Sequence, residues 1–292
     1  MRYLLLWMFA AIICLPACNL EKVIEVDLPA HDSQLVVECY LEHGKPYRLL
    51  LTESVNYFSS PTLPDIDDAT VVITHQGQSV VLEYKPQLDT LTGKIYNYAS
   101  DALVDSTGGG TYRLEISDTR GRRITAETAF LPKVPITEIT WEFEDKDKEE
   151  KDSTAKALLL IRHSEDPEQE NYYRMRILRD SAQKLINELD FVYRGLFATN
   201  GELTLGTAYR FEDKDTLQVL LYHIDRRFYD YFRTIDDAVD ANGNPFAPPA
   251  NIISGVEGGW GVFAALSYDQ KTVVVRKDSI TQRQHLQPLH RR

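Results

Sequence analysis

The 292-residue sequence predicts a mainly β protein, with an N-terminal immunoglobulin-like antiparallel sandwich followed by a second β-rich domain that contains one amphipathic helix. Three observations support this fold class. Short segments that alternate apolar and polar residues recur along the chain, turn residues separate them, and one long segment has helical spacing. The prolines in Leu131–Pro135 favour an extended connection, so we expect one domain over residues 34–133 and another over 134–292.

The N-terminus has the pattern of a bacterial secretion signal. Arg2 precedes a short apolar run that ends in Leu15-Pro16-Ala17-Cys18, which fits a lipobox. The run is shorter than a typical membrane-spanning helix. We therefore expect a signal peptide over residues 1–17, a lipid on Cys18, and a tether with a first strand over residues 18–33. Ordinary secretion with cleavage after Ala17 is the alternative.

Cysteine usage follows from that prediction. Cleavage removes Cys14 and lipidation occupies Cys18, so Cys39 is left as the only free thiol and no intrachain disulfide can form. Cys39 lies in an alternating strand segment, QLVVECYL. A buried, inert thiol is the expected state.

The charge balance bears on the class of partner. The chain carries 44 Asp and Glu against 32 Lys and Arg, a formal net charge of −12. Nucleic-acid affinity depends on basic surfaces that neutralise phosphates. We therefore expect no nucleic-acid partner.

The first domain is expected to contain short strands joined by turns at the spacing of a sandwich. Its last two strands resemble those of many immunoglobulin-like extracellular modules, and we expect residues 19–133 to fold alone. The expected strands are Gln34–Leu41, Tyr47–Thr52, Thr70–Thr74, Ser79–Tyr84, Asn97–Ala99, Thr111–Ser117 and Arg122–Ala129.

The second domain is expected to continue with strands and to close with a hairpin around Asp269-Gln270-Lys271. The hairpin would pair Val262–Tyr268 with Thr272–Arg276. The strands expected before it are Ile136–Phe143, Ala157–His163, Tyr172–Arg179, Glu188–Tyr193, Ala208–Phe211 and Thr216–Ile224.

A helix is predicted over residues 225–239. Asp225 can cap it, and Asn242-Gly243 can end it with a left-handed pair. One apolar stripe, expected to pack on a sheet rather than bind a cofactor, consists of Phe228, Tyr231, Phe232, Ile235 and Val239.

The Gly- and Pro-rich loop over residues 242–261 also carries large apolar side chains, which linkers rarely do. Pro and Gly restrict the backbone route, so an ordered loop is expected. We expect the rings of Phe246 and Trp260 to be buried and the rim at Pro248, Pro249 and Asn251 to be exposed. All five are candidate partner-binding residues. The GVEGGWG segment lacks the spacing of a phosphate-binding loop.

This loop also carries a family resemblance. NPF, a Pro-containing spacer, NI-S-G and a Gly-rich turn into GVFAA follow earlier segments that read VIEVDLP, QLVVECYLEHGKPYRLLLTES and DDATVVI. In that order they resemble the domain-of-unknown-function 4249 family, outer-membrane lipoproteins of Bacteroidota. The resemblance implies an outer-membrane lipid anchor through Cys18, on the cell surface or the periplasmic face. It also implies a candidate partner, a TonB-dependent outer-membrane transporter.

No catalytic motif stands out. The sequence has no HExxH and no GxSxG, and its charged run at 144–152 lacks the pattern of a calcium loop. His223 and Asp225 lack a third metal ligand. We expect no catalytic residues, no metal and no cofactor, and a non-enzymatic lipoprotein that binds a ligand or a partner. The alternative is a carboxylate-based hydrolase acting on a peptide or glycan, since Asp and Glu are plentiful.

Overall fold

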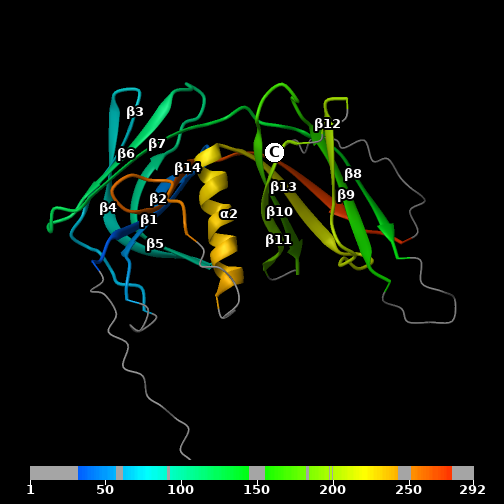
Figure 1. Ribbon diagram of the computed structural model, residues 1–292, viewed down its shortest axis with the longest axis horizontal. Helices are drawn as coiled ribbons and strands as arrows, with labels where there is room; N and C mark the ends of the chain where they lie inside the picture. The colour runs from blue at the N-terminus through cyan, green and yellow to red at the C-terminus, as the bar shows by residue number, and fades with distance from the viewer. Residues whose placement is uncertain are drawn as a thin grey trace, which may run out of the picture. The chain divides into compact units, whose positions relative to one another are not determined.

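The computed structural model describes residues 32–56, 62–90, 93–144, 155–181, 184–196, 198, 200–242 and 251–277 (Figure 1). Residues Ser33–Arg292 form one compact unit. The prediction of a mainly β fold with one helix is confirmed.

The first sheet has eight strands in the order β14-β1-β2-β5-β4-β3-β6-β7 (Figure 1). Side chains alternate between its two faces, so every second residue of β1 is buried in one core. The strands are β1 (Leu35–Leu41), β2 (Pro46–Glu53), β3 (Thr70–His75), β4 (Gln78–Asp89), β5 (Lys94–Leu103), β6 (Thr111–Ser117), β7 (Arg123–Ala129) and β14 (Trp260–Ala265).

The two edges of this sheet approach each other. The Ala265 N–H donates to Thr128 Oγ1 at 3.0 Å, which joins β14 to β7. Thr125 and Glu257 exchange two backbone hydrogen bonds of 3.1 and 2.9 Å. The sheet therefore curls around its core. Its pairs are antiparallel, apart from β1 and β14, which run parallel.

The remaining strands form two further sheets, with the orders β11-β10-β13-β15 and β12-β9-β8. A second core, which includes Leu159, Met175 and Val219, draws residues from both sheets. The strands are β8 (Ile136–Phe143), β9 (Ala157–Ser164), β10 (Tyr172–Asp180), β11 (Leu185–Arg194), β12 (Glu202–Gly206), β13 (Thr216–Ile224) and β15 (Ser267–Val274).

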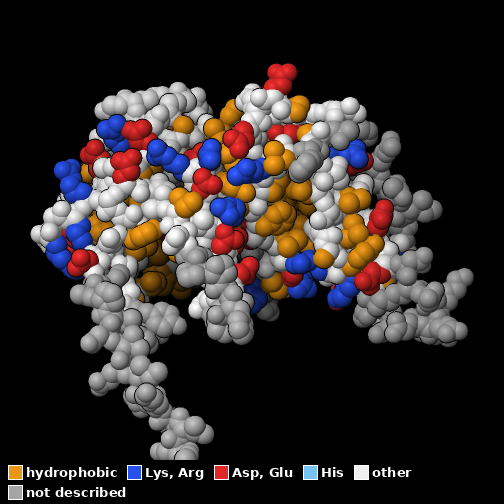
Figure 2. Space-filling view, in the orientation of Figure 1, with side chains coloured by type: hydrophobic (Ala, Val, Ile, Leu, Met, Phe, Trp, Pro, Cys, Tyr) orange, Lys and Arg blue, Asp and Glu red, His pale blue; other side chains and the backbone are white. Residues whose placement is uncertain are grey.

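The edge strand β11 is half-buried along most of its length. Phe191 and Tyr193 pack against the second core, while Val192 packs against a third core. On the face shown in Figure 2, hydrophobic side chains gather over β10, β11 and β13 with charged side chains around them. Within this surface, β11 has packed neighbours on both of its faces.

The predicted terminal hairpin is wrong. β14 pairs with β1 and β15 pairs with β13, so the two segments lie in different sheets, with only Leu266 between them. Asp269 lies inside β15, where it is buried and accepts from the Ile136 N–H at 2.9 Å. The polar triplet Asp269-Gln270-Lys271 resembles a turn in the sequence. The hydrogen bond that allows Asp269 to be buried in a strand comes from Ile136, which is distant in the sequence.

The strand predicted at Ala208–Phe211 is also wrong. The strand in this region is β12 (Glu202–Gly206), which pairs with β9. Phe211 is buried in the second core and joins Ala157 by an isolated bridge. Phe211 is buried because its ring packs into the second core, although the residue does not belong to a strand.

The helix α2 (Arg226–Ala241) begins as predicted, because the Phe228 N–H donates to the Asp225 carboxylate at 2.7 Å. Tyr229 is buried, whereas Val239 is 66% exposed, so the apolar stripe ends before Val239. Asn242 has φ −66° and is extended, so the left-handed ending is wrong for Asn242. Gly243 lies outside the described residues. No helix in the described part of the chain has the length and apolar character needed to cross a membrane.

A third core lies between the outer face of the first sheet and the four-stranded sheet. It contains Val262 and Ala264 of β14, Phe228 of α2, and Leu220 and Tyr222 of β13. The first core contains Phe263 and Ala265 of β14 as well. The boundary at Leu131–Pro135 stays a prediction, and a fragment of residues 19–133 would lack β14.

The approach of β14 to β1 predicts a severe effect for Gly261→Ala. Gly261 has φ +128°, and a Cβ there would overlap the Val37 carbonyl oxygen. We expect a loss of about 3 kcal/mol or more in unfolding free energy, since the backbone strain and the overlap add. Chemical denaturation monitored by circular dichroism measures it.

Gly206→Ala is the matched control. Gly206 has no positive φ, and a Cβ there would lie 3.5 Å from Leu160, an ordinary contact. We expect a change below about 1 kcal/mol. Equal stability losses in the two variants would contradict the close approach of β14 to β1.

Candidate functional site

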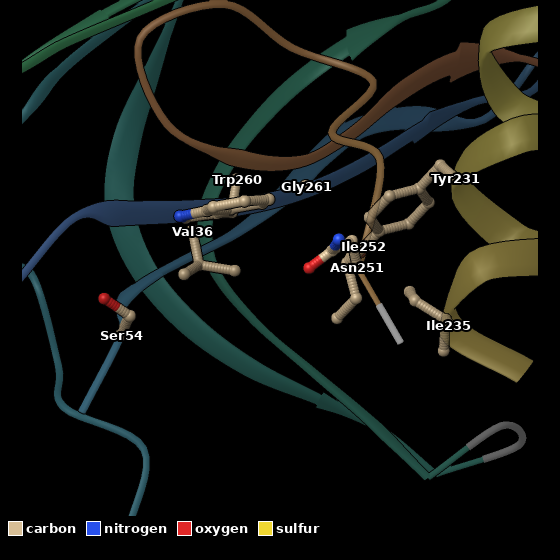
Figure 3. Close-up of a pocket in the computed structure, with 8 residues that line it drawn as sticks. All are labelled: Val36, Ser54, Tyr231, Ile235, Asn251, Ile252, Trp260 and Gly261. Atoms are coloured by element: carbon tan, nitrogen blue, oxygen red, sulfur yellow. The ribbon is translucent and has the colours of Figure 1, made fainter. Parts of the chain in front are cut away.

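An apolar pocket of about 600 Å³ lies between α2, the first two strands and the segment that precedes β14 (Figure 3). We call it the α2 pocket. Its described lining consists of Val36, Ser54, Tyr231, Ile235, Asn251, Ile252, Trp260 and Gly261. Pockets of this size and character are typical of sites that bind small molecules or the side chains of a partner.

The floor of the α2 pocket is the parallel pair of β1 and β14. Val36 and Trp260 are register partners, and both lie on the face of the sheet that points away from the first core. The Trp260 side chain is 39% exposed. The pairing of two strands from opposite ends of the chain thus presents an indole ring beside an aliphatic side chain.

Helix α2 supplies one wall. Tyr231 and Ile235 are one helical turn apart, so both project from the same face, towards Asn251 and Ile252 (Figure 3). Between them, the Thr234 hydroxyl accepts from the Ile253 N–H at 2.9 Å. This bond holds the segment that carries Asn251 and Ile252 against the helix.

A set of short-range bonds sets the path of the chain into Trp260. The Ser254 hydroxyl donates to the Gly259 carbonyl at 3.0 Å, and the Gly255 N–H donates to the Gly261 carbonyl at 2.9 Å. Gly258 has φ +79°, and a Cβ there would overlap the Arg123 carbonyl oxygen. Glycine is therefore required where the loop passes β7.

The α2 pocket is electrically neutral, because none of its eight described lining residues carries a charge. Burial, with a smaller contribution from the nearby Glu38 carboxylate, raises the pKa of Tyr231 to about 12. Tyr231 is therefore a neutral phenol at physiological pH. The polar side-chain groups that the pocket offers are the Ser54 and Tyr231 hydroxyls, the Asn251 amide and the Trp260 indole N–H.

The structure brings together two of the predicted contact residues, Asn251 and Trp260. The expectation of a buried Trp260 ring is wrong, because β14 turns this side chain to the outer face of the sheet, where it is half-exposed. Phe246, Pro248 and Pro249 lie outside the described residues, as does Cys18.

Sequence reasoning missed the other side of the pocket. Tyr231 and Ile235 belong to the predicted apolar stripe, and Val36 belongs to a predicted strand, so all three were assigned to packing. The alternation of β1 did carry a signal: Val36 falls on the face opposite Leu35 and Val37, which fill the core. An apolar residue on an outer face is a reason to look for a covering element.

His223 and Asp225 are explained without a metal. The His223 Nδ1 lies 2.8 Å from the Pro132 carbonyl oxygen, and Asp225 caps α2. Among the residues that the structure describes, no group of three or more His, Cys, Asp or Glu is arranged to hold a metal ion. His223 thus contacts the segment between β7 and β8, and Asp225 begins the helix.

Comparison with models of protein families identifies the family of this chain. The model of the family described as "Domain of unknown function (DUF4249)" matches residues 21–272. The chain belongs to the DUF4249 family. Among curated proteins, none matches this DUF4249 chain.

A solved structure offers a weaker likeness. A crystallised mutant of Salmonella alpha-2-macroglobulin is 11% identical to this DUF4249 chain, with a TM-score of 0.24. The match covers 90% of this chain and 16% of that one. A likeness at this level supports no conclusion on fold or function.

Cys39 of this DUF4249 protein is fully buried in the first core. Desolvation raises the pKa of its thiol well above the ordinary value, and the neighbouring Glu38 carboxylate adds to the shift. The reactive form of a thiol is the thiolate, which is suppressed here. The expected role of Cys39 is packing.

Thiol titration tests this role on a form that begins at Asn19, in which Cys39 is the sole cysteine. We expect no reaction with a chromogenic disulfide reagent at mildly alkaline pH while the protein is folded, and one thiol after guanidinium denaturation. A Cys39→Ser variant sets the background. Rapid titration of one thiol in the folded protein would show that Cys39 is accessible.

Proposed function

We propose that this DUF4249 protein is a non-enzymatic outer-membrane lipoprotein that binds a partner protein through the α2 pocket. The observation that carries the proposal is a neutral, apolar pocket with a half-exposed Trp260 on its floor. Tryptophan and tyrosine dominate the binding energy of many interfaces, because they bury a large area at a low cost in side-chain entropy.

The surroundings of the pocket support a protein partner over a small polar ligand. Ile252 and Ile253 are 39% and 47% exposed, so apolar surface continues from the lining onto the rim. A hydrogen bond from the Ile253 N–H to the Thr234 hydroxyl holds the loop wall against the helix, which lowers the entropy lost on binding. The proposed occupant is an apolar segment of a partner.

The proposed partner is a TonB-dependent outer-membrane transporter, with the lipoprotein helping to capture or deliver its substrate. This identity rests on the family resemblance of the sequence, and the lipid anchor on Cys18 would place both proteins in one membrane. The hydrolase alternative needs a pair of carboxylates that face one cavity. The lining of the α2 pocket contains no carboxylate, so this pocket does not support that alternative.

Replacing Cys18 tests the anchor. Stable membrane attachment needs more than one acyl chain, and a lipobox cysteine is the residue on which a bacterial lipoprotein receives them. We expect Cys18→Ala to move the protein from the membrane fraction to the soluble periplasmic fraction. Fractionation followed by immunoblotting measures this shift, and retention of the variant in the membrane would exclude an anchor at Cys18.

Truncation of the lining tests the binding role. We expect Trp260→Ala and Ile235→Ala to reduce co-purification with the transporter about tenfold or more, as expected for residues at the centre of an interface. Val239→Ala is the matched control, because Val239 lies one turn beyond Ile235 on the same helix and is 66% exposed. Thermal melts identify any variant that is merely unfolded. Full co-purification of the folded Trp260 and Ile235 variants would exclude the pocket as the contact.

A further inference from the structure

A second cavity, of about 370 Å³, lies where the β1–β2 hairpin and the β4–β5 hairpin face β10, β11 and β13. We call it the polar cleft. It shares no lining residue with the α2 pocket. A cavity of this volume can enclose a ligand about the size of a single sugar.

The polar cleft is rich in cations, although the whole chain has a net charge of −12. Five of its thirteen lining residues are Lys or Arg, against three carboxylates, Glu42, Asp89 and Asp190. The cations are Lys45, Arg48, Lys94, Arg174 and Arg176. In a protein with a net negative charge, acidic residues should outnumber basic ones at an average surface site. The excess of cations in this cavity therefore indicates a specific role.

Arg174 forms the rigid back of the cleft. Its Nε and Nη2 donate to the two oxygens of Asp190 at 2.6 and 2.7 Å, a bidentate pair. Its guanidinium also lies 4.5 Å from the centre of the Phe232 ring. Arg174 and Asp190 therefore satisfy each other, and they hold β10, β11 and α2 in place around the cavity.

Arg176, two residues further along β10, is not satisfied in this way. Its Nε lies 3.1 Å from Asp190 Oδ2 but is buried without a hydrogen-bond partner among the described residues. Asp190 therefore pairs with the charge of Arg176 but gives its Nε no aligned hydrogen bond. A buried donor without an aligned acceptor is costly, and a ligand oxygen could satisfy it.

Lys45 and Arg48 face the same cavity from the β1–β2 hairpin. Arg48 Nη1 lies 3.9 Å from Asp89 Oδ2, a long contact for an ion pair. Lys45 is exposed, and no described carboxylate lies within ion-pair distance of it. Both side chains can turn towards an anion without breaking a strong bond.

Tyrosines add further donors. Tyr40, Tyr96 and Tyr222 line the cleft. Burial raises the pKa of Tyr96 and of Tyr222 to about 12, so their hydroxyls stay protonated at physiological pH. Cationic side chains therefore outnumber carboxylates in the lining, five to three, and the hydroxyls can donate as well.

We propose that the polar cleft binds a small ligand that carries an oxyanion, held by Lys45, Arg48 and Arg176 and by the tyrosine hydroxyls. The oxyanion supplies an acceptor for the Arg176 Nε and a negative charge for the cations that exceed the carboxylates. A carboxylate on a sugar ring and a phosphate share this chemistry, and both form forked bonds with guanidinium groups. The site stands independently of the proposed partner contact at the α2 pocket.

Calorimetry on the purified full chain at low ionic strength tests the site with three probes. The probes are D-glucuronate for a sugar carboxylate, inorganic phosphate for a phosphate, and D-glucose as the neutral counterpart of glucuronate. We expect at least one anion to bind and glucose to give no heat. Added sodium chloride should weaken binding, because the contacts are charged.

Three substitutions localise the binding. We expect Lys45→Gln and Arg176→Gln each to weaken anion binding about tenfold or more, the scale of one lost charge-assisted bond. Lys45→Gln keeps the test valid if Arg176→Gln unfolds, since Lys45 is exposed. Arg179→Gln is the matched control on β10, because Arg179 pairs with Glu188 and does not line the cleft.

The outcomes separate cleanly. Binding of glucuronate without phosphate, or of phosphate without glucuronate, supports the site and identifies the source of the oxyanion. Binding of both supports a general oxyanion site. If neither anion binds, the proposal is overturned. Equal binding of glucose and glucuronate, or anion binding that Lys45→Gln leaves unchanged, overturns it as well.

Discussion

The parallel pairing of β14 with β1 is the contact on which the rest of the unit depends. β14 is buried on both faces, with Phe263 and Ala265 in the first core and Val262 and Ala264 in the third. Residue alternation in a strand sends neighbouring side chains to opposite faces, so one strand can join two cores only if both faces are covered. Leu266 alone then links β14 to β15 in the next sheet.

Local patterning predicted most strands, because burial alternates along them as the sequence suggests. β1, β6 and β7 show strict alternation. The pairing of β14 was not predictable in the same way. A strand buried on both faces has no alternation to read, and its partner β1 lies at the other end of the chain, so no turn residue marks their register.

The residues of the candidate sites were likewise predictable only where the signal is local in the sequence. Asn251 and Trp260 were predicted from the composition of one loop, which is a local signal. Tyr231 and Ile235 needed knowledge of what faces the helix, because an apolar stripe looks the same over a core and beside a cavity. The polar cleft was missed because its cations come from separate hairpins and from β10, where Arg174 and Arg176 alternate with core residues.

The outer face of β1 explains why the α2 pocket and the polar cleft are separate cavities rather than one groove. Val36 and Tyr40 project from this face, because an even number of positions separates them, and Glu42 follows directly after the last residue of β1. Val36 lines the α2 pocket, Tyr40 packs edge-on against Phe228 at 6.0 Å, and Tyr40 and Glu42 line the polar cleft. The helix thus fills the middle of the interface through Phe228. The α2 pocket at one end is lined by apolar residues, and the polar cleft at the other end is lined by cations.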